Sequence, residues 1–140
     1  MRHLGRGRFQ AFSCGVPSKI AEMPNSWAWL ALQSAGIGTQ GLHSKDWSTF
    51  AKRNAAAMDF VITLDERALL EHPPWPGQPE VALWSYPPLV DKKQSSTALG
   101  LLALQTLHSL RLRIDLLVNL HARGASVQDL RHDLRDLAHR

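Results

Sequence analysis

The chain has 140 residues, which is the length of one ordinary domain. Apolar residues make up 44% of it and charged residues 20%, which is typical of a globular chain and excludes a disordered tail or a collagen-like fibre. The single cysteine, Cys14, excludes an intramolecular disulfide and a multi-cysteine zinc site.

The net charge of +4 is confined to the first 20 residues, which carry no acidic side chain and these basic ones: Arg2, Arg6, Arg8 and Lys19. A basic segment can contact an anion or a nucleic acid, but solvated charges flanking a strand are the simpler interpretation. The chain shows no secretory signal segment and no apolar run of about 20 residues. We therefore expect a cytoplasmic protein that does not bind a membrane.

The first third of the chain predicts one strand and one helix. Residues 8–13 alternate in a strand-like way and lead into Cys14. Asn25 is a good N-cap for a helix over residues 27–35, and Gly36 is a suitable residue to end it.

The middle of the chain predicts a strand between two short helices. Asp46 can cap a helix over residues 47–51, and the apolar run 58–64 is typical of a buried parallel strand. A short helix ending near Leu70 should follow. The prolines of residues 72–79 then impose a stiff loop. Trp75, within this loop, is either a packing residue or a residue at the rim of a substrate cleft.

The last third predicts another strand and two amphipathic helices. Residues 81–84 form the strand, and Ser95 or Ser96 can cap a long helix that ends near Gly124. Ser126 and Asp129 are spaced as a capping box for a final helix. The apolar stripes of the two helices are Ala103, Leu107, Leu110, Ile114 and Leu117, and then Val127, Leu130, Leu134 and Leu137. Strands alternating with helices predict an α/β class with a parallel sheet of three strands.

Five sequence blocks, in order between residues 2 and 90, resemble the low-molecular-weight protein tyrosine phosphatase family and its arsenate reductase branch. The blocks are residues 7–15, 25–28, 36–45, 59–63 and 75–84. The resemblance implies a three-layer phosphatase-like domain over residues 1–122 with a parallel sheet. Residues 123–140 are expected to form an extra amphipathic helix, as a C-terminal extension.

The family that these blocks resemble has a catalytic chemistry whose key residues are not found in this chain. The family's first strand leads into a Cys-x5-Arg phosphate loop, whose cysteine attacks phosphorus or arsenic. Residues 1–5 resemble the end of the helix after that loop, so the first strand and the loop are missing and the sheet is incomplete. Cys14 does not replace the nucleophile, because Ile20 stands where the arginine is needed and Pro17 removes an amide donor.

The other catalytic groups are also missing. The family places an aspartate, as general acid, where this chain has Pro87 and Pro88, and Asp91 is a poor substitute because it is shifted along the chain. The histidines follow no recognised metal-ligand spacing. Acidic residues on the last helix, among them Asp129 and Asp133, disfavour binding to nucleic acid. We expect no catalytic, cofactor-binding or metal-binding residue.

Three functional hypotheses remain open. The chain is an N-terminally incomplete phosphatase or arsenate reductase, inactive as it stands, which would bind phosphate or arsenate if the missing segment were restored. Alternatively, it is a non-catalytic remnant. The third hypothesis is a binding or scaffolding protein that uses its open sheet edge or its C-terminal helices to contact a partner chain or a second copy.

Overall fold

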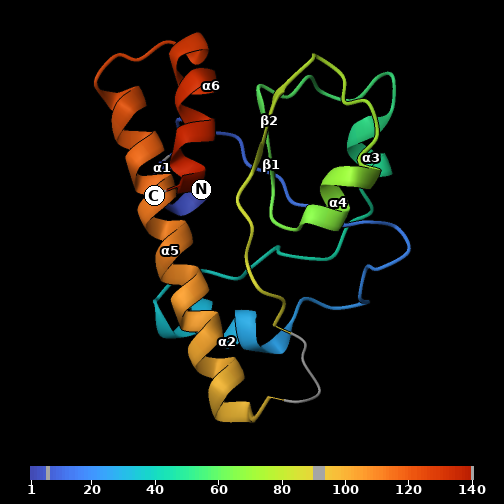
Figure 1. The fold of residues 1–140 in the computed structure, drawn as a ribbon, viewed down its shortest axis with the longest axis vertical. Coiled ribbons are helices and arrows are strands. Elements are labelled where there is room, and N and C mark those ends of the chain that lie inside the picture. The colour runs from blue at the N-terminus through green and yellow to red at the C-terminus, as the bar shows by residue number, and fades with distance from the viewer. Residues whose placement is uncertain (6, 90–93, 140) are drawn as a thin grey trace.

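A small parallel sheet lies between two groups of helices in the computed structural model, which describes residues 1–5, 7–89 and 94–139 (Figure 1). Its two strands are β1, Phe60–Thr63, and β2, Glu80–Leu83, with Phe60 opposite Glu80. The connection between the strands contains the short helix α4, Glu66–Glu71. The mixed α/β class is confirmed, and strands lie within or beside the predicted ranges 58–64 and 81–84. However, β1 is half-buried along its length and not buried as predicted, and the sheet of the described residues has two strands and not three.

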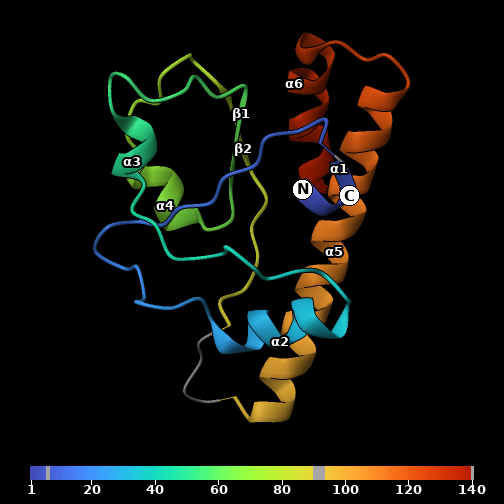
Figure 2. The same cartoon turned by 180° about the vertical axis from the view of Figure 1, so that it is seen from behind.

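Helices make up most of the remaining regular structure. They are α1 (Arg2–Gly5), α2 (Ser26–Ser34), α3 (Ser48–Ala51), α5 (Ser96–Ala122), α6 (Val127–Asp136) and the 3-10 turn η1 (Leu137–His139). The caps predicted at Asn25 and Ser95 are confirmed, because the side chain of Asn25 accepts from the Trp27 and Ala28 amides and Ser95 accepts from the Ala98 amide. The cap predicted at Asp46 is not, because Trp47 is the N-cap residue of α3, although the Asp46 carboxylate accepts from the Ser48 amide at 2.7 Å. Both views show α2 packed across α5 (Figures 1 and 2).

The strand predicted over residues 8–13 is wrong. These residues lie outside any strand, and the parallel pairing is limited to an isolated bridge between Gly15, just after the segment, and Asp46. The Gly15 amide donates to the Lys45 carbonyl at 2.9 Å, and the Trp47 amide donates to the Gly15 carbonyl at 3.1 Å. The alternating pattern alone does not make a strand, because a strand also needs a neighbour to which its backbone can bond.

The hydrophobic core joins β2 to α5 and α6. Its buried members are Ala82, Trp84, Leu117, Leu130, Leu134 and Leu137. Trp84 is 1% exposed, and its Nε1 donates to the Leu134 carbonyl at 3.2 Å. Arg135 of α6 also forms an ion pair with Glu80 of β2. Residues 123–140, expected as a C-terminal extension, thus contain a helix that completes this core.

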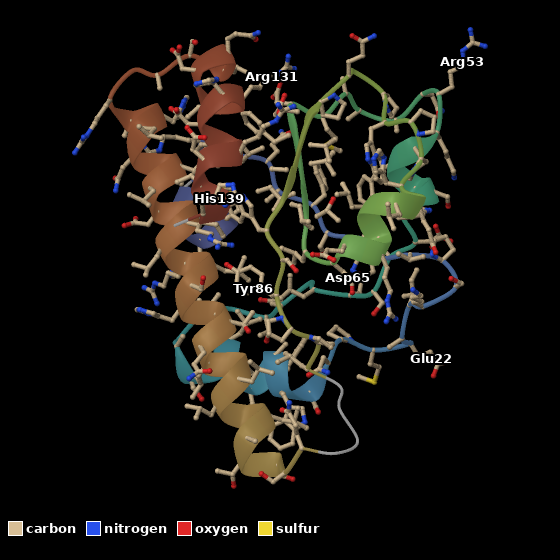
Figure 3. The ribbon with its side chains drawn as sticks, viewed as in Figure 1. Glu22, Arg53, Asp65, Tyr86, Arg131 and His139 are labelled. Atoms are coloured by element: carbon tan, nitrogen blue, oxygen red, sulfur yellow. The ribbon has the colours of Figure 1, made fainter. Side chains whose placement is uncertain are left out.

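Arg113, in α5, forms polar contacts with the segment after β2 and with η1. Its guanidinium donates to the Tyr86 hydroxyl at 3.0 Å and to the Ala138 carbonyl at 2.9 Å. The same group lies over the rings of Trp84 and Tyr86, at 5.7 and 5.1 Å from their centroids. Tyr86 lies between β2 and α5 (Figure 3). The core and these contacts hold one edge of the sheet firmly, on the β2 side.

Gly77, in the proline-rich loop, requires the absence of a side chain. Its φ is +87°, and an added Cβ would lie 2.6 Å from the Ala57 Cβ. We expect Gly77→Ala to lower the free energy of unfolding by about 1 to 3 kcal/mol, as measured by urea denaturation. Gly38→Ala is the matched control, because nothing lies within 4 Å of that Cβ and no positive φ is required. Equal stabilities of the two variants would contradict this account of Gly77.

The N-terminus of α6 should contribute a pH-dependent term to stability. The predicted capping box is present, with the Asp129 carboxylate accepting from the Ser126 hydroxyl at 2.7 Å and the Ser126 amide at 2.9 Å. These two hydrogen bonds lower the pKa of Asp129 below its ordinary value. A lowered folded-state pKa means that the stabilisation is present above the unfolded-state pKa of about 3.9 and is lost as the pH falls through the folded-state pKa.

Asp129→Asn should therefore be less stable than the wild type at pH 7, with a difference that shrinks as the pH falls below about 4. Urea midpoints measured between neutral and acidic pH check this expectation. The double variant Ser126→Ala/Asp129→Asn should show the same pH dependence as Asp129→Asn alone, because both changes break the same pair. A stability difference that stays constant with pH would show that the carboxylate charge is not involved.

Candidate binding cavity

A cavity of about 600 Å³ lies along β1 and also reaches Trp84, just after β2, and Leu110 and Ile114 of α5. One wall is formed by β1 and the residues just after it, among them Val61, Ile62 and Leu64. The opposite wall is formed by residues 12–16, which pass β1 in Figure 2 (blue). Its lining is mainly apolar and aromatic, and its volume falls within the range of ordinary ligand pockets.

The backbone of β1 offers unpaired groups to this cavity. The Glu80 amide donates to the Asp59 carbonyl and the Trp84 amide donates to the Thr63 carbonyl, so residues 59 and 63 turn their backbone groups toward β2. Because alternate residues of a parallel strand bond to opposite neighbours, Phe60 and Ile62 turn theirs toward the other edge. No strand of the described part of the chain pairs with that edge.

Contacts to the loop before α3 hold the opposite wall in place. Gly15 is fixed by Lys45 and Trp47 through the two backbone hydrogen bonds of its bridge. The rings of Phe12 and Phe50 lie 5.5 Å apart between centroids, and both side chains line the cavity. This wall therefore contributes Phe12 to the apolar lining of the cavity, and both backbone groups of Gly15 are already hydrogen-bonded.

Three aromatic side chains form one corner of the cavity, which we call the aromatic corner: Trp47, His72 and Trp75. The Trp75 ring meets Trp47 edge-on at 6.1 Å and stacks on His72 at 6.4 Å, between centroids. The Nε1 atom of Trp75 is buried and has no hydrogen-bond partner in the described part of the chain. A buried indole N–H without an acceptor is costly, but this atom is shielded from the cavity as well as from solvent, so a bound group would reach it only if the ring moved.

Cys14 lines the cavity, but its surroundings do not favour nucleophilic chemistry. Burial of the thiol raises its pKa above the ordinary value, Lys45 opposes this shift by its charge and Asp46 adds to it. A reactive cysteine needs the opposite shift, because the thiolate is the nucleophile. Although the thiol is partly buried, the Cys14 residue as a whole is exposed. Pro17 stands where a phosphate loop would need an amide donor, and Ile20 stands where it would need an arginine.

The positions where the resemblance would place a general acid differ in what the structure shows of them. Asp91 lies outside the described residues, and Pro87 and Pro88 are exposed and do not line the cavity. Trp75, which the sequence left as a packing or rim residue, lies in the aromatic corner. The contribution of residues 12–16 and Trp47 was missed. Their only sequence signal was the alternating apolar pattern before Cys14, interpreted as a strand.

Comparison of the chain with family models, with curated proteins and with solved structures gives no match in any of the three. Within the described ranges, no group of three or more His, Cys, Asp or Glu side chains is placed to hold a metal ion. No helix in those ranges has the length and apolar character needed to cross a membrane.

Proposed function

We propose that this protein is a non-catalytic binding protein that takes an extended segment of another polypeptide into the cavity beside β1. The observation that carries this proposal is the free edge of β1, whose unpaired backbone groups at Phe60 and Ile62 border an apolar cavity. An extended segment can pair its backbone with the free groups of this edge and can also fill the apolar cavity with its side chains.

The geometry favours a polypeptide over a small apolar molecule. A small apolar molecule would cover the cavity walls but leave the backbone groups of Phe60 and Ile62 unpaired, and such groups are costly once water is displaced. Apolar side chains on both sides of β1, Val61 and Ile62, line the cavity. A bound strand would therefore be apolar on both faces, as buried parallel strands are.

Amide hydrogen exchange with a synthetic probe tests the proposal directly. The probe is a nine-residue peptide of valine, isoleucine and threonine with terminal glycines and a fluorescent label. Its binding should slow exchange at the Phe60 and Ile62 amides, because they gain acceptors. The Val61 and Thr63 amides are the internal control, since strand alternation already directs them to β2. Binding without this alternating protection would contradict strand addition.

A second copy of the protein is the main competing occupant of the edge. Light scattering of the unlabelled protein over a range of concentrations distinguishes the two cases. A stable dimer that the probe peptide does not dissociate would contradict the proposal of a separate partner. A monomer that binds the peptide would support it. Nucleic acid is not expected in this cavity, because its lining is mainly apolar.

We also propose that the chain derives from a low-molecular-weight phosphatase, within an incomplete three-layer domain. The support is the order of the five sequence blocks, together with a parallel β1–β2 pair at two of them. The purified chain should then show no hydrolysis of p-nitrophenyl phosphate and no arsenate reduction above background, and Cys14→Ser should not change this. Activity that depends on Cys14 would overturn the non-catalytic assignment. The cytoplasm remains the proposed location, because Cys14 is the only cysteine.

A further inference from the structure

The cavity wall opposite β1 also carries backbone groups that lack a protein partner. The amides and carbonyls of Phe12 and Cys14 form no hydrogen bond within the part of the chain that the structure describes. Both residues line the cavity and are exposed, so these groups are hydrated in the free protein. A bound segment that displaces this water must offer them new partners, because unpaired backbone groups are costly away from water.

The pairing of Gly15 indicates the direction in which these groups point. Gly15 donates to the Lys45 carbonyl and accepts from the Trp47 amide, which is the pattern of one residue in a parallel strand pair. In an extended chain, the backbone groups of successive residues point to opposite sides. Those of Cys14 are thus directed away from Lys45 and Trp47, on the side of the cavity that Cys14 lines. Phe12, two residues earlier, shares this side in an extended chain.

The sequence of this wall is that of a strand that lacks a neighbour. Residues 8–13 alternate as a strand does, yet they lie outside any strand in the free protein. The two walls also match in length, because Phe12 and Cys14 face the alternate residues Phe60 and Ile62 across the same cavity. One extended segment between the walls can therefore bond to both of them.

We propose that the bound segment is a central strand, which pairs with β1 on one side and with residues 12–14 on the other, and that its binding converts residues 12–14 into a strand. This inference rests on the proposed function, because it assigns what the same cavity requires of its partner. A segment paired along both edges uses the amide of every central residue, which excludes proline there. Both of its edges must also be free before binding. The partner is thus an apolar segment without proline that is unpaired in its own protein.

Amide hydrogen exchange distinguishes pairing on two sides from pairing on one. Binding of the probe peptide described above should slow exchange at the Phe12 and Cys14 amides as well as at those of Phe60 and Ile62. The Gly15 amide is the internal control, because it already donates to the Lys45 carbonyl. Protection on the β1 side alone would overturn this inference and leave the proposed function standing.

Two N-methylated forms of the probe test the same point by affinity. One form carries methyl groups on the amides of its even-numbered residues and the other on those of its odd-numbered residues, so each has one edge blocked. If pairing is one-sided, either form can turn its free edge toward β1 and bind as tightly as the unmethylated probe. If pairing is two-sided, each form loses one wall, and fluorescence anisotropy should show an affinity about tenfold lower for both.

A third form, methylated at every central amide, is the matched control, because both of its edges are blocked and it should not bind. Undiminished affinity of the two half-methylated forms would overturn the central-strand inference. Undiminished affinity of the fully methylated form, or absence of protection at the Phe60 and Ile62 amides with the unmethylated probe, would show that strand pairing does not occur and would overturn the proposed function itself.

Discussion

Replacing Trp84 with alanine should lower the free energy of unfolding by about 3 to 5 kcal/mol, the largest stability effect expected of any single change in this chain. Trp84 is 1% exposed and lies at the centre of the core. Its removal leaves a cavity among Leu117, Leu130 and Leu134 and leaves the Leu134 carbonyl without its donor. Since domains of this size are stable by only about 5 to 15 kcal/mol, the variant should be close to unfolding at 25 °C.

Urea denaturation, followed by circular dichroism, measures this effect. Trp84→Phe should lie between the wild type and the alanine variant, because it keeps most of the apolar volume but loses the hydrogen bond from Nε1. Leu70→Ala is the surface control, because Leu70 is 86% exposed, and it should change stability by less than about 0.5 kcal/mol. A Trp84→Ala variant as stable as the Leu70→Ala variant would contradict the arrangement of the core.

Phe12→Asp should lower the affinity for the probe peptide about 100-fold while leaving the protein folded. Phe12 is on the wall opposite β1 and is 50% exposed without a ligand. A carboxylate at this position is hydrated in the free protein, but a bound segment would remove its water without offering it a partner. The contact of Phe12 with Phe50 contributes only modestly to the stability of the free protein.

The matched control for this variant is Leu70→Asp, which adds the same charge at an exposed apolar residue outside the cavity lining. Anisotropy titrations should give wild-type affinity for Leu70→Asp and the large loss for Phe12→Asp. Thermal unfolding of both variants checks that they are folded. Equal affinities of the two variants would show that the peptide does not enter this cavity.

The elements that the sequence predicted well are those with local signals. Asn25, Ser95 and Ser126 are caps whose side chains bond to amides a few residues away, so the information lies within one turn of helix. The runs at 58–64 and 81–84 are apolar enough to indicate strands whatever their neighbours, although β1 is only half-buried in the structure.

The segment 8–13 and the cavity were not predictable in this way. The segment has the alternation of a strand, but strand pairing is a non-local property and its partner is not specified by the pattern. The cavity depends on the distance between two walls that are far apart in sequence. The sequence could suggest that Trp75 lines a cleft, because prolines surround it in the loop 72–79. It could not suggest this for Trp47, which contacts Trp75 only in the folded chain.

The position of α6 in the core has a consequence for synthesis on the ribosome. Trp84 leaves the exit tunnel well before Leu130, Leu134 and Leu137, and Leu117 leaves it shortly before them, yet all five residues belong to one buried cluster. The nascent chain must therefore expose an apolar surface until α6 emerges, and the native core can form only after that helix has been made. During that interval the nascent chain is prone to aggregate through this apolar surface.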